Sequence, residues 1–177
     1  MGMVTGVWIL AAVLAITAGW TDWRSRRIPN WLTVSGLILG LAVRAVAFGW
    51  AGAKDALLGA GLGLLLLLPF VMMRALGAGD WKLAGAFGAF LGPGPLITVL
   101  FGTILVNGLM AAVMVVRKGR VRETLRNLAL MVAAVFTLRM PGPDLTLDNP
   151  DLIKVPFGVA FAIAVILFIG GKVWQLY

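Results

Sequence analysis

Two residue types that carry much of enzyme chemistry are missing from this sequence, which contains no cysteine and no histidine. Their absence excludes disulfide bonds, thiolate nucleophiles, zinc sites built on cysteine or histidine, histidine-ligated haem and any histidine-based catalytic triad. Acids are also few, with seven Asp and Glu residues in a chain of 177. Any catalysis by this chain must therefore use carboxylates, hydroxyls, amines or the peptide backbone.

Charged side chains are scarce overall, at 12% of the residues, while hydrophobic residues make up 61%. Soluble domains have about 25% charged and about 45–50% apolar residues. A chain this apolar cannot cover a water-facing surface, so we expect residues 1–177 to form a single membrane-embedded domain in contact with the lipid bilayer. The net charge of +8 is accounted for by loops that face anionic lipid, and no nucleic-acid partner is expected.

The uncharged stretches locate the membrane segments. They cover residues 1–21, 29–49 (interrupted only by Arg44), 56–73, 83–91, 96–116 and 155–171. The fourth stretch would give about 13–14 Å of helix, too short to cross about 30 Å of hydrocarbon. A further apolar run at 127–138, between Arg126 and Arg139, is typical of an interfacial or re-entrant helix. The sequence therefore predicts an all-α integral membrane protein with about six transmembrane helices, the fourth of them short.

Basic residues are distributed unevenly between the loops. If the loop after the first segment is cytoplasmic, twelve Lys and Arg residues lie on that side, whereas Lys54 and Lys172 lie outside and Arg44 lies near the outer boundary. Because cytoplasmic loops carry an excess of basic residues, we expect this orientation in the plasma (inner) membrane, with both termini outside. Basic residues follow the first apolar stretch instead of preceding it, so a cleaved signal peptide is not expected.

Two of the acids stand where an apolar segment meets the predicted cytoplasmic face. Asp22 ends the first segment and Asp80 opens the short fourth one. Ionisable groups at membrane depth are costly, so each is a candidate for a functional site. Asp80 closes a Gly-x-Gly-Asp sequence, in which glycines permit close backbone approach and positive φ angles. We expect Gly77, Gly79 and the following Lys82 to support the loop that presents Asp80.

Two carboxylates brought together can hydrolyse a peptide bond without any other catalytic side chain. Mutual repulsion and desolvation raise the pKa of one carboxyl group, so that the pair shares a proton near neutral pH. The ionised member then activates water while the protonated member polarises the scissile carbonyl. This chemistry requires neither a metal nor a cofactor, and the composition leaves it open.

Other interpretations exist for these two acids. Taken singly, Asp22 among arginines is typical of a surface ion pair, and a Gly-x-Gly-Asp run is a weak pattern. Two other functions also suit a membrane protein with two acids, namely a small proton-coupled transporter and a non-catalytic assembly protein of a pilus or secretion system. A proton relay would place its acids at different depths in the bilayer, whereas Asp22 and Asp80 are predicted at one face.

Three runs of residues carry a resemblance to a known family. They are Asp22 with Arg26-Arg27-Ile28-Pro29-Asn30, then Gly77-Ala78-Gly79-Asp80-Trp81-Lys82-Leu83, and finally Lys154-Val155-Pro156-Phe157-Gly158-Val159-Ala160. The first two resemble the type IV prepilin leader peptidases, intramembrane aspartyl proteases that share the G-x-G-D element. The third is similar to the Pro-aromatic-Gly segment that opens the last helix of that family. The resemblance extends from residue 1 to about residue 171.

This resemblance implies an aspartyl endopeptidase in which Asp22 and Asp80 form the catalytic pair. Its implied substrates are prepilin-like proteins, pilins or pseudopilins, whose basic leader is cut at the cytoplasmic membrane face, after a glycine and before the hydrophobic helix. Bifunctional members carry an additional methyltransferase domain, for which this sequence has no room between its first two segments. It is most similar to the short, protease-only form of tight-adherence pilus systems, so N-methylation is not implied.

A cluster of acids precedes the last apolar segment. Asp144, Asp148 and Asp151 lie within eight residues, in a proline-rich stretch that contains no basic residue before Lys154. A basic leader would be repelled by the other basic loops on the predicted cytoplasmic side. We therefore predict that these three acids dock the leader of the substrate, the alternative being a solvated loop without a role.

Overall fold

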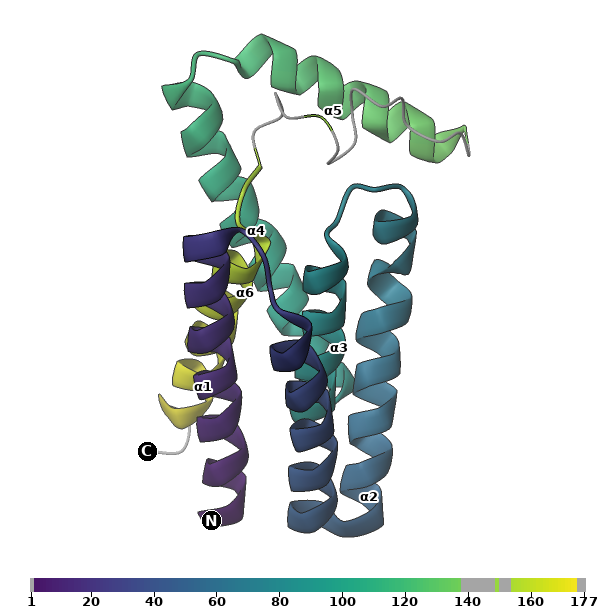
Figure 1. The fold of residues 1–177 in the computed structure, drawn as a ribbon, viewed down its shortest axis with the longest axis vertical. Coiled ribbons are helices and arrows are strands. Elements are labelled where there is room, and N and C mark those ends of the chain that lie inside the picture. Colours follow the sequence, from purple (N-terminus) through teal and green to yellow (C-terminus); the bar gives the residue numbers. More distant parts are fainter. Residues whose placement is uncertain (1, 138–148, 150–153, 175–177) are drawn as a thin grey trace.

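The computed structural model describes residues 2–137, 149 and 154–174. Within these ranges the chain forms helices and no strand (Figure 1). The helices are α1 (Gly2–Ser25), α2 (Asn30–Met72), α3 (Ala78–Leu91), α4 (Pro93–Arg117), α5 (Val121–Phe136) and α6 (Phe157–Trp174). The prediction of an all-α fold is confirmed.

Helix α2 is a hairpin of two antiparallel arms, residues 30–48 and 50–72 (Figure 1). The chain reverses at Gly49, whose φ of 60° and ψ of −146° lie outside the helical region. Glycine tolerates such a positive φ because it has no Cβ. The arms correspond to the predicted segments 29–49 and 56–73. The break that these segments imply at residues 50–55 is wrong, because a single glycine turns the chain and Asp55 already lies in the second arm.

Helices α1, α2 and α4 contain the stretches that are long and apolar enough to cross a membrane: Thr5–Ser25, Asn30–Met72 and Pro93–Arg117. Part of α6, Phe157–Lys172, is a shorter apolar helix. These stretches agree with the predicted membrane protein, while the number of crossings stays a prediction.

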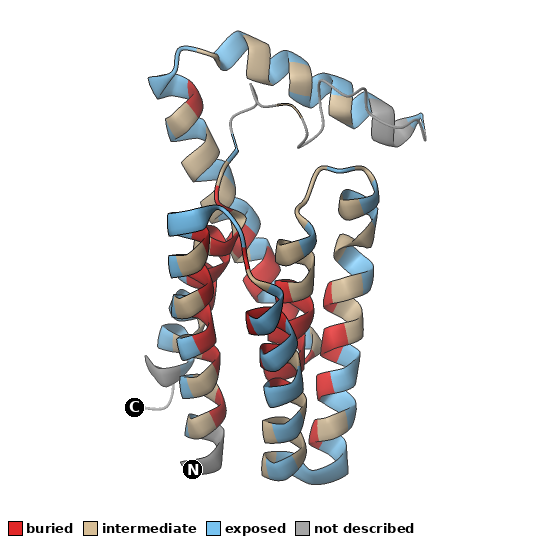
Figure 2. Ribbon diagram, in the orientation of Figure 1, coloured by how far each residue is buried: buried red, intermediate tan, exposed pale blue. Residues whose placement is uncertain are grey.

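Helix α3 forms the centre of the bundle. Every residue from Leu83 to Leu91 is buried, and Figure 2 shows this continuous buried stretch beside the buried faces of α1 and α6. Small residues bring α3 against the second arm of α2. A Cβ added at Gly88 would lie 2.1 Å from the Gly59 carbonyl oxygen. Only glycine allows this close approach, which is typical of helix contacts in membranes.

Helix α5 differs from the others in its direction. It runs across one end of the bundle, roughly perpendicular to the remaining helices (Figure 1), and it packs chiefly on α4. Its exposed apolar residues include Val121, Leu125, Leu128 and Val132, which recur at helical spacing along one face. The predicted short helix at 127–138 is thus part of a longer amphipathic helix, and its interfacial position stays a prediction.

The α5 end of the bundle gathers the segments that the sequence analysis singled out. The end of α1, both ends of the α2 hairpin, and the starts of α3 and α6 face α5 (Figure 1). Apart from Arg44, Lys54 and Lys172, every Lys and Arg that the structure describes belongs to this end. The predicted grouping of basic residues on one side is therefore what the fold produces.

Candidate active site

Two sequence-distant segments meet at the α5 end, the loop between α1 and α2 and the start of α3. The Lys82 Nζ atom donates a hydrogen bond to the Asn30 Oδ1 atom at 2.9 Å. A Cβ added at Gly79 would lie 3.1 Å from the Ile28 carbonyl oxygen, so the absence of a side chain lets the two backbones touch. The run that begins with Asp22 and the run that contains Asp80 therefore lie against one another.

Asp22 lies in the last turn of α1 and is 5% exposed. The Gly158 backbone N–H, in the first turn of α6, donates to the Asp22 Oδ2 atom at 2.8 Å. A Cβ added at Gly158 would lie 3.0 Å from both the Cβ and the Oδ2 atoms of Asp22. Glycine at 158 thus gives the carboxylate room to receive this bond, and the positive end of the α6 dipole stabilises a negative charge there.

Asp80 lies in the first turn of α3 and is partly buried. Its Oδ2 atom occupies space that a side chain at Gly77 would fill, since a Cβ there would lie 2.9 Å away. Gly77 has an extended φ of −69°, and Gly79 lies inside the helix. The expectation of positive φ angles at these glycines is therefore wrong. They provide space for the Asp80 carboxylate and for the Ile28 backbone.

The two aspartates line one cavity of about 290 Å³. Its remaining walls are Arg26, Arg27, Ile28, Gly77, Ala78 and Gly79. Neither carboxylate forms an ion pair with any residue that the structure describes. Two carboxylates that form no ion pair and line one small space can share a proton and hold a water molecule between them.

Arg26 has a structural role at this site that the sequence analysis did not identify. Its φ of 52° turns the chain after α1, and its Nη1 atom donates to the Lys154 carbonyl oxygen at 2.8 Å. This bond joins the loop after α1 to the segment that leads into α6. In the sequence, Arg26 is one of three arginines near Asp22, so nothing distinguishes it from a residue that faces the membrane surface.

A second cavity of about 210 Å³ shares Gly77 and Asp80 with the first. Its other walls are Ala75, Leu76, Asn107, Lys154, Val155 and Phe157. Asn107 was missed by the sequence analysis, although it is the only side-chain amide within the apolar stretch 96–116. A lone amide at membrane depth is a signal that could have identified it.

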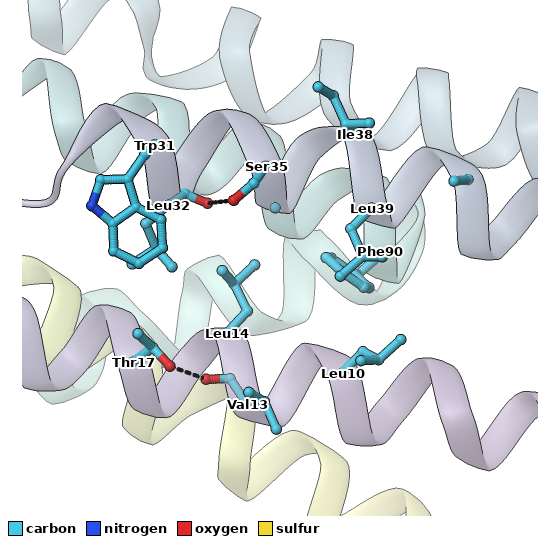
Figure 3. Close-up of a pocket in the computed structure, with 12 residues that line it drawn as sticks. Leu10, Val13, Leu14, Thr17, Trp31, Leu32, Ser35, Ile38, Leu39 and Phe90 are labelled. Carbon is cyan, nitrogen blue, oxygen red and sulfur yellow. Dashed lines mark hydrogen bonds between the residues drawn. The ribbon is translucent and has the colours of Figure 1, made fainter.

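A third cavity, of about 650 Å³, lies between α1 and the first arm of α2 (Figure 3). It contains none of the predicted site residues. Its two hydroxyl groups donate to carbonyl oxygens of their own helices, Thr17 to Val13 at 2.8 Å and Ser35 to Leu32 at 3.4 Å (Figure 3). This cavity is an apolar groove with satisfied polar groups and no group suited to catalysis.

Three further predicted site residues, Asp144, Asp148 and Asp151, lie outside the described residues. Their docking role stays a prediction. In the part of the chain that the structure describes, no group of three or more His, Cys, Asp or Glu residues is arranged to hold a metal ion.

Comparison with known proteins assigns the family. Residues 8–115, which include both aspartates, match the type IV leader peptidase family. A prepilin leader peptidase/N-methyltransferase of Myxococcus xanthus (strain DK1622) is 28% identical over 181 residues, covering 77% of this chain and 53% of that protein. One from Xanthomonas campestris pv. campestris is 30% identical over 126 residues, covering 67% and 43%.

The chain thus spans about half the length of these curated relatives. No solved structure matches it. The family match, however, covers more than half of this chain and includes α1 to most of α4. The chain belongs to the type IV leader peptidase family.

Proposed function

We propose that this chain is an intramembrane aspartyl endopeptidase that removes the basic leader from prepilin-like proteins. The observation that carries the proposal is the cavity lined by both Asp22 and Asp80, which come from helices distant in sequence and have no described basic partner. Membership of the leader peptidase family and relatives named prepilin leader peptidase support the substrate class.

The reaction uses one ionised and one protonated carboxyl group. We assign the ionised role to Asp22, because the Gly158 N–H donates to it and such a bond favours the charged form. Asp22 takes a proton from a water molecule in the shared cavity, and the oxygen of that water attacks the scissile carbonyl. Asp80 gives its proton to the carbonyl oxygen. The tetrahedral intermediate then collapses: the peptide C–N bond breaks as the proton held by Asp22 passes to the leaving amine, and one hydroxyl of the intermediate returns its proton to Asp80 as the carbonyl re-forms.

The α5 end is the cytoplasmic face in this proposal, and the membrane is the plasma (inner) membrane. The grouping of basic residues at that end supports this orientation. It also places both carboxylates on the side where the substrate carries its basic leader, at the depth where the hydrophobic segment of the substrate begins. Both termini of the present chain are then extracytoplasmic.

A cleavage assay tests the function. The purified full chain would be incubated with a peptide that carries a basic leader, a glycine and about 20 apolar residues, and the products would be measured by mass spectrometry. We expect one cut after the glycine by the wild type and none by Asp22→Asn or Asp80→Asn. The double variant should be no worse than either single one, because members of a catalytic unit are not additive.

The pH profile provides a second readout of the same pair. A dyad that shares one proton loses its base when both carboxyl groups are protonated and loses its acid when both are ionised. The kcat/KM value should therefore fall on both the acidic and the alkaline side. Substantial turnover by either folded single variant would refute the role of the dyad, and peptide binding without cleavage by the wild type would favour a non-catalytic assembly protein.

A further inference from the structure

Asn107 presents an unusual polar group beside the proposed dyad. It lies on α4 and lines the 210 Å³ cavity that also contains Asp80. Its Oδ1 atom is buried and accepts no hydrogen bond from any residue that the structure describes. A buried acceptor without a donor costs free energy, so a fold selected for stability alone would not retain it at this position.

Thr103 lies one helical turn earlier on α4. Its hydroxyl forms a hydrogen bond to a backbone carbonyl of the same helix. Thr103 is fully buried, and its Oγ1 atom donates to the Val99 carbonyl oxygen at 2.8 Å. Thr17 and Ser35 bond to their own helices in the same way. The Asn107 oxygen cannot use this solution, because helix carbonyls are acceptors as well. It requires an N–H or O–H donor from outside its helix backbone, and a bound peptide main chain supplies N–H groups.

The cavity is placed to receive such a donor from a bound peptide. Asp80 borders both this cavity and the one that contains Asp22. A peptide whose scissile carbonyl lies at the dyad would therefore continue past Asp80 toward Asn107. The volume of about 210 Å³ equals that of roughly seven water molecules. An extended main chain entering this space needs partners for its own N–H and C=O groups.

We propose that this cavity binds the substrate main chain next to the scissile bond, with the Asn107 Oδ1 atom accepting a substrate N–H. This inference rests on the peptidase function proposed above. Rotation about the Cβ–Cγ bond, a broad torsion in asparagine, turns the amide toward the cavity when the peptide enters. Asn107 is thus a substrate-binding residue, and its oxygen, which accepts from no described residue of the protein itself, acquires a substrate partner on binding.

Binding measurements separate this role from turnover. The probe is the prepilin-like peptide described above, and the protein is the full chain with Asp22→Asn, which binds without cutting. Adding Asn107→Leu, a change of similar volume, should weaken binding by about two- to tenfold, the range of one neutral hydrogen bond. The matched control is Thr103→Val on the same helix, which should bind like the parent because the Thr103 hydroxyl serves only its own helix.

A thermal melt distinguishes substrate binding from a structural role. Asn107→Leu removes an acceptor without a partner, so the melting temperature should equal or exceed that of the parent. A clearly lower melting temperature would mean that the amide stabilises the fold, and it would overturn the proposal.

Peptides that contain an ester bond identify which substrate N–H donates to the Asn107 Oδ1 atom. Each main-chain N–H flanking the scissile bond would be replaced, one at a time, by an ester oxygen. One ester should weaken binding to the Asn107 parent and cause no further loss in Asn107→Leu. Equal ester penalties in both proteins at every position would overturn the inference.

The outcomes of these measurements also distinguish the inference from the function on which it rests. A wild type that cleaves, together with unchanged binding in Asn107→Leu, refutes the role of Asn107 and retains the peptidase. A wild type that binds without cleaving refutes the peptidase, while the ester cycle still decides the role of Asn107. Absence of peptide binding overturns both.

Discussion

The aspartates at the two ends of the bundle differ in whether they form an ion pair. At the end opposite α5, the Asp55 Oδ2 atom forms an ion pair with the Arg44 Nη2 atom at 3.1 Å. At the α5 end, Asp22 and Asp80 share a cavity and form no ion pair within the described chain, although most of the basic residues lie there. A high local density of positive charge therefore does not by itself neutralise a carboxylate.

The contacts of individual basic residues explain this difference. Arg26 donates to the Lys154 carbonyl oxygen and Lys82 donates to the Asn30 side-chain oxygen. Both cations thus bond to neutral acceptors and fasten the segments around the cavity to one another. The Asp22 carboxylate instead accepts a backbone N–H from the first turn of α6, and the Asp80 carboxylate lies beside the Gly77 backbone.

After removal of either aspartate, the largest expected effect comes from crowding Asp22. In Gly158→Val the new Cβ would lie 3.0 Å from the Asp22 carboxylate and from the Ile28 side chain, so the carboxylate must move. Displacement of a catalytic group by about 1 Å can cost about 100-fold in rate, and we expect a loss of that order in kcat/KM. Gly170→Val on the same helix is the control, because a Cβ there meets nothing within 4 Å. Equal activity of the two variants would contradict the role of Gly158.

A smaller loss of kcat/KM is expected when a side chain at residue 79 pushes against the Ile28 backbone, where the two segments that contain the aspartates meet. A Cβ at Gly79 would lie 3.1 Å from the Ile28 carbonyl oxygen and 3.2 Å from the Ile28 Cβ. Gly79→Val should reduce kcat/KM by about tenfold or more, while the protein still inserts and purifies normally. Gly79→Ala should lie between this variant and the wild type. If both variants cleave the peptide like the wild type, the glycine only shapes the helix start.

The docking role predicted for the three acids that precede the last apolar segment can be tested by substitution. Neutralising them together, by Asp144→Asn, Asp148→Asn and Asp151→Asn, should raise KM with little change in kcat, the pattern of lost uniform binding. Each exposed contact is worth about 0.2–1 kcal/mol, so KM should rise on the order of tenfold. The effect should shrink in high salt. An unchanged KM on a basic leader at low ionic strength would leave the acids without a docking role.

The smallest effect is expected at the opposite end. Asp55→Asn removes the partner of Arg44 but lies far from the proposed dyad, so kcat/KM should stay within about twofold of the wild type. The Asp55 side chain is 57% exposed but the Arg44 side chain only 13%, so the loss of stability should exceed the roughly 1 kcal/mol limit of a fully exposed pair. A thermal melt would measure that loss. A large loss of activity would show that the two ends of the bundle are coupled.

Local sequence patterns predicted the helices and the grouping of their ends well. Apolar runs of membrane length define α1 and α4, and the alternation of helix directions places Asp22 and Asp80 at the same end. The two arms of α2 were predicted as separate segments, but the tight turn at Gly49 could not be, because Gly49 is one of 23 glycines and only tertiary packing decides which of them adopts a positive φ. Likewise, the start of α5 at Val121 falls within a charged stretch whose apolar residues are periodic instead of continuous, so a search for uncharged runs begins the helix too late.

The details of the candidate site depend on contacts between segments distant in sequence. The sequence singled out the run that contains Gly158, yet nothing local indicates that its N–H reaches Asp22, 136 residues away. The contact of Asn107 with the cavity at Asp80 also requires the packing of α4 against the start of α3 and the segment before α6. Residue types were therefore predictable, whereas their partners were not.

The apolar groove between α1 and the first arm of α2 has a consequence for how the dyad is held. Helix α1 packs chiefly on α6 and helix α3 on the α2 hairpin, with less extensive packing between these pairs. Asp22 and Asp80 thus belong to different halves of the molecule, and the groove is the seam between them. The spacing of the two proposed catalytic carboxylates is therefore set where the halves meet, and we expect a substitution that fills the groove to change kcat/KM without contacting either aspartate.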